Sequence, residues 1–427
     1  ENIQALADCA LVIEAIVESL QAKRDLFRQL ESICSEQCIL ASNTSSLSIT
    51  SIAAQLTQPQ RVLGLHFFNP APVMALVEIV SGLASDPALA ECLYDTASAW
   101  GKKPVHTRST PGFIVNRVAR PFYAESLRLQ QEGCADCATL DALMRDAGGF
   151  AMGAFELTDL IGHDVNYAVT CSVFEAYYGD TRFLPSLIQK ELVDAARLGR
   201  KSGQGFYSYA VGAERPQAAT LISEQRVTAC VVEGDLGIAA GLIARLHEQQ
   251  IEIIQRDGRG LLRVGDAVLA LSDGRMACQR ARDEGLRNLI LLDLACDYGT
   301  ASRLAISYAA GIEPLALAQG VALLQQAGLQ VSQLSDSPAL AVLRTVAMLA
   351  NEAADALLQG VASAADIDLA MRAGVNYPQG PLAWADAIGL QHILVVLENL
   401  QASYGEERYR PSLLLRRHVA EGRKFHD

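Results

Sequence analysis

The chain has 427 residues, of which 50% are hydrophobic and 19% charged, and its formal net charge is −13. This length suffices for two to four domains with cores of their own, and the negative charge disfavours nucleic acid or an anionic membrane as the main partner. We find no run of 18 or more apolar residues, so the sequence predicts no membrane span. Ten cysteines at scattered spacings favour reduced thiols and a cytoplasmic location over a disulfide framework.

Strand and helix signals alternate at the start of the chain. Apolar strand-like runs and helical spacings follow one another in the segments 9–17, 18–34, 38–43, 47–56 and 61–68. This β-α-β-α-β order predicts parallel strands joined by crossover helices. Long helical patterns follow up to about residue 210, which places the boundary between an α/β unit and a helical unit near residue 108.

Polar residues stand where the second predicted strand ends. Asn43, Thr44 and Ser45 follow "LAS", and ligands of open α/β sheets bind beyond the carboxyl ends of the strands. These residues therefore are candidates for binding a ligand. The alternative is that they cap the next helix, which is a common use of Ser and Thr.

His66 and Glu78 lie on two apolar strands that are joined by only about six residues. A parallel return needs a longer crossover, so the two strands should be antiparallel neighbours. Each residue is six positions from Pro72, so a connection symmetric about Pro72 would set them directly opposite. An imidazole paired with a carboxylate is a candidate general base, and a structural pair that closes the hairpin is the alternative.

Asn116 lies within a predicted helix, five residues before Pro121. An amide inside a helix is mildly unfavourable, and the proline distorts the same helix. Asn116 could point into a cleft or be solvated. Cys134 and Cys137 form a CxxC pair without a second pair or suitably spaced histidine, so we predict no metal site there.

The second half of the chain repeats the first. Pro111 and Pro338, Gly133 and Gly360, and Gly162 and Gly389 are all separated by 227 residues. One offset held through so many positions indicates a duplication. The second copy has its own α/β section, whose turn "VEGDLG" at 232–237 resembles a G-x-G-x-x-G fingerprint with valine in place of the first glycine and with acidic residues at 233 and 235. We interpret this turn as a vestige of a nucleotide site.

Five ordered motifs carry a resemblance to a known family: "VIEAIVESLQAKRDLF", "ASNTSSLSITSIA", "GLHFFNPAPVMALVEIV", "TPGFIVNRV" and "GRKSGQGFYSY". Residues 1 to about 210 resemble the (S)-3-hydroxyacyl-CoA dehydrogenases. The tandem second copy resembles the longer bacterial subgroup of phenylacetate catabolism, the 3-hydroxyadipyl-CoA or 3-hydroxybutyryl-CoA dehydrogenases. The resemblance implies oxidation of 3-hydroxyacyl-CoA to 3-ketoacyl-CoA with hydride transfer to NAD.

The resemblance also implies a fold and its division. It predicts the C-terminal part of a Rossmann-type NAD-binding domain at 1–107, a helical substrate and dimerisation domain at 108–215, a degenerate Rossmann-like section at 226–335, and a second helical domain at 336–427. Because the helical domains of single-copy relatives pair across a dimer, we expect the two helical domains here to pack as a pseudo-dimer within one chain, and a homo-oligomer of the chain stays open.

Roles carry over residue by residue. The resemblance makes His66 the general base, held by Glu78, with Ser45 and Asn116 binding the reacting oxygen. The positions at which the family contacts NAD are Ala15, Glu18, Lys23, Ser45, Asn69 and Lys201. Adding 227 to His66, Glu78 and Asn116 gives Asp293, Ala305 and Leu343, so the second copy should not be a second active site.

In this family a strand and a Gly-rich turn precede the first motif, and neither is found upstream of it here. We therefore expect residues 1–427 alone to bind NAD weakly or not at all. Two other functions stay open: a catalytically silent relative that serves as a structural or binding protein, and a dehydrogenase of a free hydroxy acid.

Overall fold

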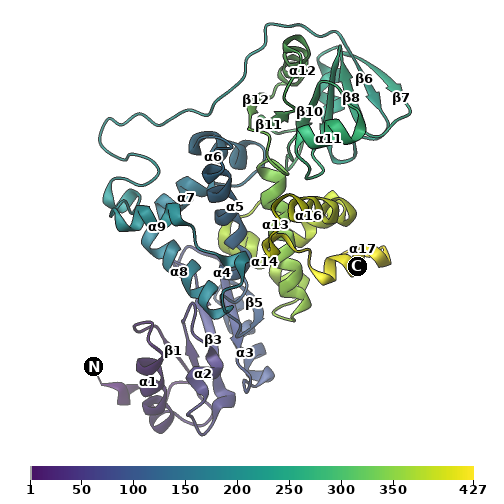
Figure 1. The fold of residues 1–427 in the computed structure, drawn as a ribbon. Helices are drawn as coiled ribbons and strands as arrows, with labels where there is room; N and C mark the ends of the chain where they lie inside the picture. The colour runs from purple at the N-terminus through teal and green to yellow at the C-terminus, as the bar shows by residue number, and fades with distance from the viewer. Residues whose placement is uncertain (1) are drawn as a thin grey trace.

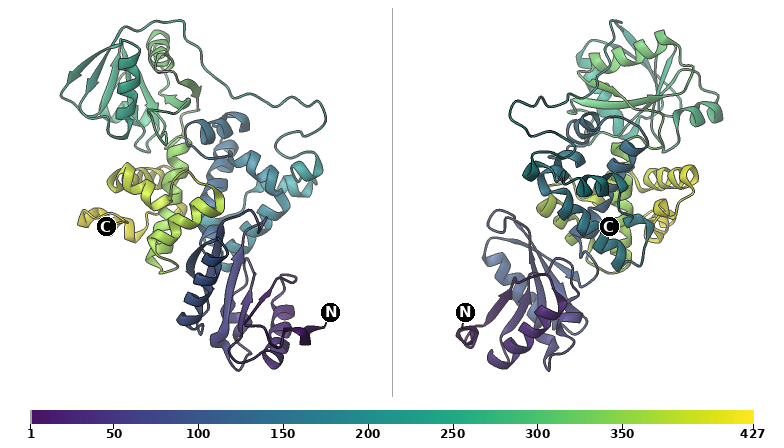
Figure 2. Two further views of the ribbon diagram at one scale, coloured as in Figure 1. Left: turned by 180° about the vertical axis from the view of Figure 1, so that it is seen from behind. Right: turned by 60° about the vertical axis from the view of Figure 1, so that its left-hand side comes forward.

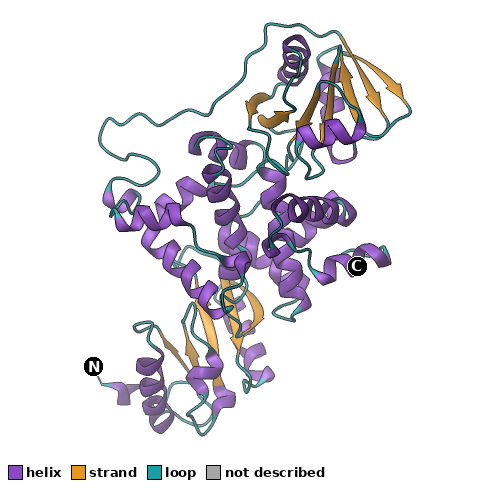
Figure 3. Cartoon of the chain, in the orientation of Figure 1, coloured by secondary structure: helices purple, strands orange, loops and turns teal. Residues whose placement is uncertain are grey.

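The computed structural model describes residues 2–427, and it places helical regions between two α/β regions (Figure 1). Figure 3 shows the strands gathered at the two ends of the molecule and helices between them. This is the predicted α/β fold class with its duplicated arrangement. Among the described residues, no helix combines the length and apolar character that a membrane crossing requires.

The first α/β region contains a five-stranded sheet in the order β1-β2-β3-β4-β5. Its strands are β1 (Leu11–Glu14), β2 (Ile39–Ser42), β3 (Val62–Phe67), β4 (Leu76–Ser81) and β5 (Lys103–Arg108), and its helices are α1 (Leu20–Ile33), α2 (Ile49–Ala53) and α3 (Pro87–Ala99). All neighbouring strands are parallel except β3 and β4, which are antiparallel. Apolar side chains fill both faces of this sheet, including Phe27 against one face and Leu93 against the other.

The first helical region follows directly. Its helices are α4 (Val115–Val118), α5 (Arg120–Gln131), α6 (Cys137–Asp146), α7 (Ala154–Ile161), α8 (His163–Ala176) and α9 (Leu187–Asp194). The predicted distortion near Pro121 is present, because the helical pattern is interrupted at Ala119 between α4 and α5. Residues 210–228 then run as a long loop to the second α/β region, as the views in Figure 2 show.

The second α/β region is a seven-stranded sheet in the order β12-β11-β10-β9-β8-β6-β7. Its strands are β6 (Ala229–Glu233), β7 (Glu252–Arg256), β8 (Leu261–Val264), β9 (Ala267–Leu271), β10 (Leu289–Leu292), β11 (Arg303–Tyr308) and β12 (Gln330–Gln333); its helices are α10 (Gly241–Glu248), α11 (Ala277–Glu284) and α12 (Pro314–Gln326). The pair β10 and β11 is antiparallel, as are β3 and β4. The second helical region comprises α13 (Val342–Leu358), α14 (Ala364–Val375), α15 (Pro381–Ile388), α16 (Leu390–Tyr404) and α17 (Leu413–Glu421).

The two helical regions pack against each other through α5 and α13, which share one apolar core. Two buried ion pairs cross this contact in opposite directions. Arg117 Nε lies 2.6 Å from Oε1 of Glu352, and Arg344 Nε lies 2.7 Å from Oε2 of Glu125. Residues 117 and 344 are 227 apart, as are 125 and 352. The contact is therefore isologous in the manner of a two-fold dimer, although both halves belong to one chain.

Candidate active site

His66 and Glu78 lie opposite each other on β3 and β4, as the hairpin argument predicted. Nδ1 of His66 is 2.6 Å from Oε2 of Glu78, and only 7% and 1% of these side chains are exposed. The aromatic rings of Phe68 and Phe113 pack on the imidazole at 4.5 and 5.8 Å between ring centroids. Because the carboxylate engages Nδ1, the hydrogen of the neutral ring resides there and Nε2 keeps its lone pair.

The second oxygen of Glu78 contacts the start of the first helical region. Oε1 accepts hydrogen bonds from the backbone N–H groups of Ile114 and Val115, at 3.0 and 3.1 Å. One buried carboxylate thus orients the imidazole and satisfies two free donors at the start of α4. The position of Asn116 on α4 is consequently tied to that of His66.

Ser45 and Asn116 meet at the end of β2. The side-chain amide of Asn116 lies 3.5 Å from the carbonyl oxygen of Ser45, and both residues line a cavity of about 240 Å³. Val169 and Ser172 of α8 line the same cavity. Asn116 therefore faces a cavity between the sheet edge and α8, which decides between the two environments that the sequence left open. His66 is connected to this site through Phe113, its ring neighbour, which precedes α4.

Helix capping does not explain the polar residues after β2. The N-cap of α2 is Ser48, whose hydroxyl accepts from the N–H of Ser51. Asn43 instead accepts a hydrogen bond from the N–H of Phe67 at 2.8 Å, which joins the ends of β2 and β3. The capping role considered from the sequence is thus wrong for residues 43–45.

Glu18 follows β1 and Lys23 lies in the first turn of α1, next to this site. Lys23 is buried and its ammonium lies 2.7 Å from Glu14 and 3.3 Å from Glu18. Burial acts to raise the pKa of Glu18, but hydrogen bonds from Thr44 and Ser46 and the charge of Lys23 outweigh it and lower that pKa. Glu18 therefore keeps its negative charge and organises the loop after β2.

Glu14 also belongs to this polar group, and the sequence analysis did not single it out. Its carboxylate accepts from Lys23 and, at 2.6 Å, from the hydroxyl of Ser42. The available signal was an acidic residue at the end of an apolar strand, followed nine residues later by a lysine on the next helix.

The remaining positions proposed for the cofactor divide into two groups. Ala15 directly follows β1 and Asn69 lies two residues after β3, at the same sheet edge as Glu18 and Ser45. Lys201 lies elsewhere, because its ammonium pairs with Asp164 at the start of α8. The structure thus gathers five of the six positions and leaves Lys201 in the helical region.

The second copy keeps the strand register without the base. Asp293 occupies the position of His66 and its N–H donates to the carbonyl of Ala305, which stands in the place of Glu78. The Asp293 carboxylate accepts from the N–H groups of Ala341, Val342 and Leu343 at the start of α13. The position that corresponds to His66 holds a carboxylate in place of an imidazole, as the offset of 227 predicted.

The fingerprint-like turn of the second copy is closed by the protein itself. Gly234 has a φ of +79°, and a Cβ atom on it would lie 2.4 Å from the carbonyl oxygen of Gly258. Glu233 forms an ion pair with Arg263 at 2.8 Å. The close backbone approach that a pyrophosphate requires is therefore taken by the loop 257–260, which supports the interpretation as a vestige.

The CxxC pair lies at the start of α6, with Cys134 buried. Burial raises the pKa of the Cys134 thiol to about 11 and that of Cys137 to about 12. Both thiols consequently stay protonated near neutral pH, which disfavours redox or metal chemistry at this pair.

Known protein families match most of the chain, with residues 210–268 outside the matches. The NAD binding domain of 3-hydroxyacyl-CoA dehydrogenase matches residues 1–110, and the C-terminal domain of the same family matches residues 112–209 and 341–425. The "3-hydroxybutyryl-CoA dehydrogenase reduced Rossmann-fold domain" matches residues 269–338. Among curated relatives, 3-hydroxyadipyl-CoA dehydrogenase from Escherichia coli (strain K12) is 48% identical over 97% of this chain and 82% of its own.

The chain belongs to the 3-hydroxyacyl-CoA dehydrogenase family. It is an NAD-dependent enzyme that oxidises 3-hydroxyacyl-CoA, as the resemblance implied. A crystal structure of 3-hydroxybutyryl-CoA dehydrogenase from Escherichia coli K12 covers 98% of this chain and 83% of its own, with 46% identity and a TM-score of 0.89. The human mitochondrial hydroxyacyl-coenzyme A dehydrogenase is 43% identical over 47% of this chain and 63% of its own, which corresponds to a single copy.

Proposed function

We propose that His66 is the general base of this dehydrogenase and that Glu78 positions it. The observation that carries the proposal is the buried contact of 2.6 Å between Nδ1 of His66 and the Glu78 carboxylate. With Nδ1–H donated to Glu78, Nε2 accepts the proton of the substrate 3-hydroxyl, and the carboxylate stabilises the imidazolium that forms. In the reverse direction the imidazolium donates a proton to the 3-keto oxygen.

Ser45 and Asn116 bind and align the reacting oxygen in this proposal. Support comes from their common cavity and from the way Glu78 ties the start of α4 to the base. A hydroxyl and an amide that flank one oxygen restrict the substrate to orientations in which the base can reach its proton.

The edge formed by β1, β2 and β3 suits the nicotinamide cofactor, because ligands bind beyond the carboxyl ends of parallel strands. We propose that Ala15, Glu18, Lys23, Ser45 and Asn69 hold NAD at this edge, where the Glu18 carboxylate keeps its negative charge and lies 3.3 Å from Nζ of Lys23. NAD, when bound, accepts the hydride from C3 of the substrate. Lys201, on the same argument from resemblance, would have to leave Asp164 to take part.

The proposal also covers the acyl group of the substrate and the assembly of the enzyme. Relatives named for 3-hydroxyadipyl-CoA and 3-hydroxybutyryl-CoA support short acyl chains, as in phenylacetate or fatty-acid degradation. We place the enzyme in the cytoplasm and propose domains at 1–107, 108–215, 226–335 and 336–427, as the sequence predicts. The pairing of α5 with α13 supports an enzyme whose helical dimer contact is formed within one chain. Light scattering would measure whether whole chains associate further.

Absorbance at the NADH band tests this function. The full-length enzyme should oxidise NADH with acetoacetyl-CoA and leave free acetoacetate unchanged, because the thioester is part of the substrate. Equal rates with the two compounds would indicate a hydroxy-acid dehydrogenase, and no turnover with either would indicate a silent relative.

A further inference from the structure

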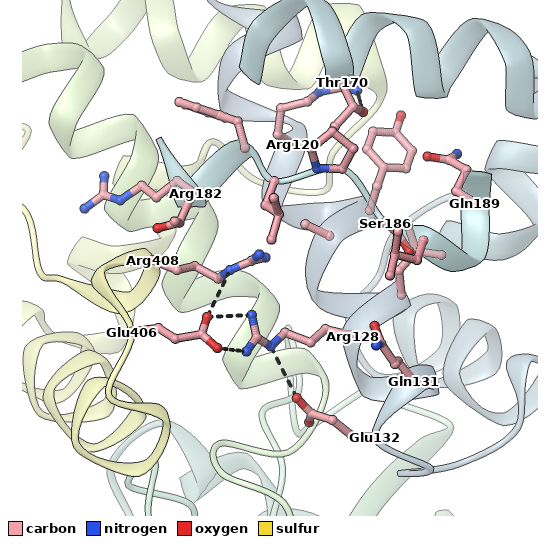
Figure 4. A pocket seen from close by; sticks show the side chains of 18 of the residues that line it. Arg120, Arg128, Gln131, Glu132, Thr170, Arg182, Ser186, Gln189, Glu406 and Arg408 are labelled. Carbon is pink, nitrogen blue, oxygen red and sulfur yellow. Dashed lines mark hydrogen bonds and ion pairs between the residues drawn. The ribbon is translucent and has the colours of Figure 1, made fainter. Parts of the chain in front are cut away.

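A second, larger cavity of about 750 Å³ lies beside α5, on the side of the contact between the two helical regions (Figure 4). One wall is a face of α5, and the others come mainly from residues 181–189 and 406–408, which include parts of the matching segments "YGDTRFLPSL" and "YGEERYRPSL" of the two copies. Thr170 is the α8 residue in this wall, whereas Val169 and Ser172 line the cavity at Ser45. The two cavities therefore meet different faces of α8. Small-molecule sites have volumes in this range.

Three arginines in this wall have carboxylate partners. Arg128 pairs with Glu406, Arg182 pairs with Asp355, and Arg408 lies 3.9 Å from Glu125 and 3.7 Å from Glu406. Figure 4 shows the side chains of Arg128 and Glu406 joined by dashed lines in the lower part of the view. The positive charge of these three side chains is thus balanced by the protein.

Arg120 is different. It is 6% exposed, and no carboxylate of residues 2–427 lies within ion-pair distance of its guanidinium. Its contacts are the hydroxyl of Thr170, at 3.1 Å from Nη1, and the ring of Tyr123, at 4.9 Å from Cζ. Its Nε has no hydrogen-bond partner. Burial lowers the pKa of Arg120, because neither contact supplies a full negative charge. A buried guanidinium without a counter-ion is costly, and an anion in the cavity would offset that cost.

We propose that this cavity binds a ligand with one carboxylate and a short apolar chain, and that the carboxylate pairs with Arg120. The single unbalanced cation matches one negative charge, and a phosphate of higher charge would face Glu132 and Glu406 in the same wall. Leu127, Phe183 and Leu187 supply apolar surface for the chain of the ligand. The buried hydroxyl of Ser186, which has no partner, can donate a further hydrogen bond.

Two sources can supply this chemistry. One is the distal carboxylate of the substrate's own acyl group, as in a 3-hydroxyadipyl thioester, and this source rests on the proposed function. The other is a free carboxylic acid that binds apart from the reaction. This cavity and the cavity at Ser45 meet different faces of α8, which favours a free acid that binds apart from the reacting group. Kinetics can distinguish the two sources.

Calorimetric titration of the full-length enzyme with hexanoate tests the site itself. We expect one hexanoate per chain, binding weakened about tenfold or more in Arg120→Met, and no binding of the uncharged hexanamide. Arg416→Met, which removes an exposed arginine paired with Glu398 on α16, is the matched control and should bind as the parent does. Ala124→Leu keeps Arg120 but fills the cavity from α5, so it should also weaken hexanoate binding. This variant tests the site if Arg120→Met fails to fold.

Kinetics then identify the source. A tenfold rise in KM for 3-hydroxyadipyl-CoA in Arg120→Met, with 3-hydroxybutyryl-CoA unchanged, assigns the site to the substrate. Unchanged kinetics with both, together with lost hexanoate binding, assign it to a free acid. Equal hexanoate binding by the parent and Arg120→Met, or no binding by a folded parent whose adipyl kinetics are insensitive to Arg120, would overturn the proposal. Failure of the parent to oxidise 3-hydroxybutyryl-CoA would overturn the proposed function instead, and the titration would still decide the site.

Discussion

Both copies have a buried carboxylate at the start of their helical region, but the carboxylate has a different function in each copy. In the first copy, Glu78 comes from β4, caps the N–H groups that open α4, and also holds His66 on β3. In the second copy, Asp293 takes the position of the histidine and caps the N–H groups that open α13 by itself. The strand register is the same in both. Both copies thus need a carboxylate that caps the first helix of the helical region, whereas the histidine can be lost without losing this cap.

The largest effect is expected from His66→Gln, which makes the first copy resemble the second in lacking an imidazole at this strand position. Oxidation of a 3-hydroxyacyl-CoA should fall about a thousandfold or more, because no group remains to take the proton. The melting temperature should stay near that of the parent, since Glu78 still caps α4. Full turnover by a folded His66→Gln enzyme would remove the base from the mechanism.

Glu78→Gln separates the two tasks of the carboxylate. Its carbonyl oxygen can still accept from Ile114 and Val115, but its NH₂ group would face Nδ1 of His66 and favour the other tautomer. We expect turnover about a hundredfold lower with a small loss of stability. Glu78→Ala should lose both functions, and a Gln variant as unstable as the Ala variant would contradict this separation. Steady-state rates and thermal unfolding provide the two measurements.

The reciprocal ion pairs between the copies are expected to contribute unequally. Glu352→Gln leaves Arg117 buried without a carboxylate and should lower the free energy of unfolding by about 3 kcal/mol. Glu125→Gln should cost less, because Arg344 keeps Glu132 at 3.0 Å. Glu398→Gln, which removes an exposed pair with Arg416, should change stability by about 0.5 kcal/mol or less. Denaturant unfolding would contradict this order if Glu125→Gln were the most damaging.

Asp293 should make stability depend on pH in the direction opposite to an ordinary capping carboxylate. Burial raises the pKa of Asp293 to about 6, from an ordinary value of 3.8. As pH rises through this window the unfolded chain loses its proton first, so the free energy of unfolding falls, by at most about 3 kcal/mol. The advantage of the parent over Asp293→Asn should therefore shrink between about pH 4 and pH 7. An advantage that grows with pH would contradict the raised pKa.

The smallest effect is expected at the vestigial turn. Asp235→Asn reduces the negative charge beside a loop that already fills the turn, so NAD affinity should stay unchanged. The corresponding variant Glu18→Gln removes a charge from the proposed cofactor edge and should weaken NAD binding about tenfold. Equal weakening by Asp235→Asn and Glu18→Gln would make the second turn a live nucleotide site.

Local rules were sufficient for much of this site. The short connection between β3 and β4 predicted their antiparallel pairing and the meeting of His66 with Glu78, because strand geometry alone fixes that register. The offset of 227 likewise predicted that Asp293 stands in the place of the histidine. Periodicity located the strands and helices, since each buries one side or both.

Other features depended on contacts between distant segments. The second contact of Glu78, to Ile114, joins residues 36 positions apart, and no sequence pattern in either segment predicts it. The same holds for Glu14, whose role requires α1 to return beside β1. The position of Lys201 on Asp164 was also not predictable, because the motif that contains it carries no information about which neighbour it meets. The resemblance supplied roles for Glu78 and Lys201 but not for Glu14, and the packing of the domains determined the places of all three.

The isologous contact between α5 and α13 has a consequence for how such an enzyme can change over time. Because the two halves are tethered, each encounters the other at a fixed effective concentration that dilution does not reduce. In a dimer of identical chains, a substitution appears on both sides of the axis at once. Here either side can be altered alone, so one half is free to lose its chemistry and acquire a new surface while the other preserves the reaction.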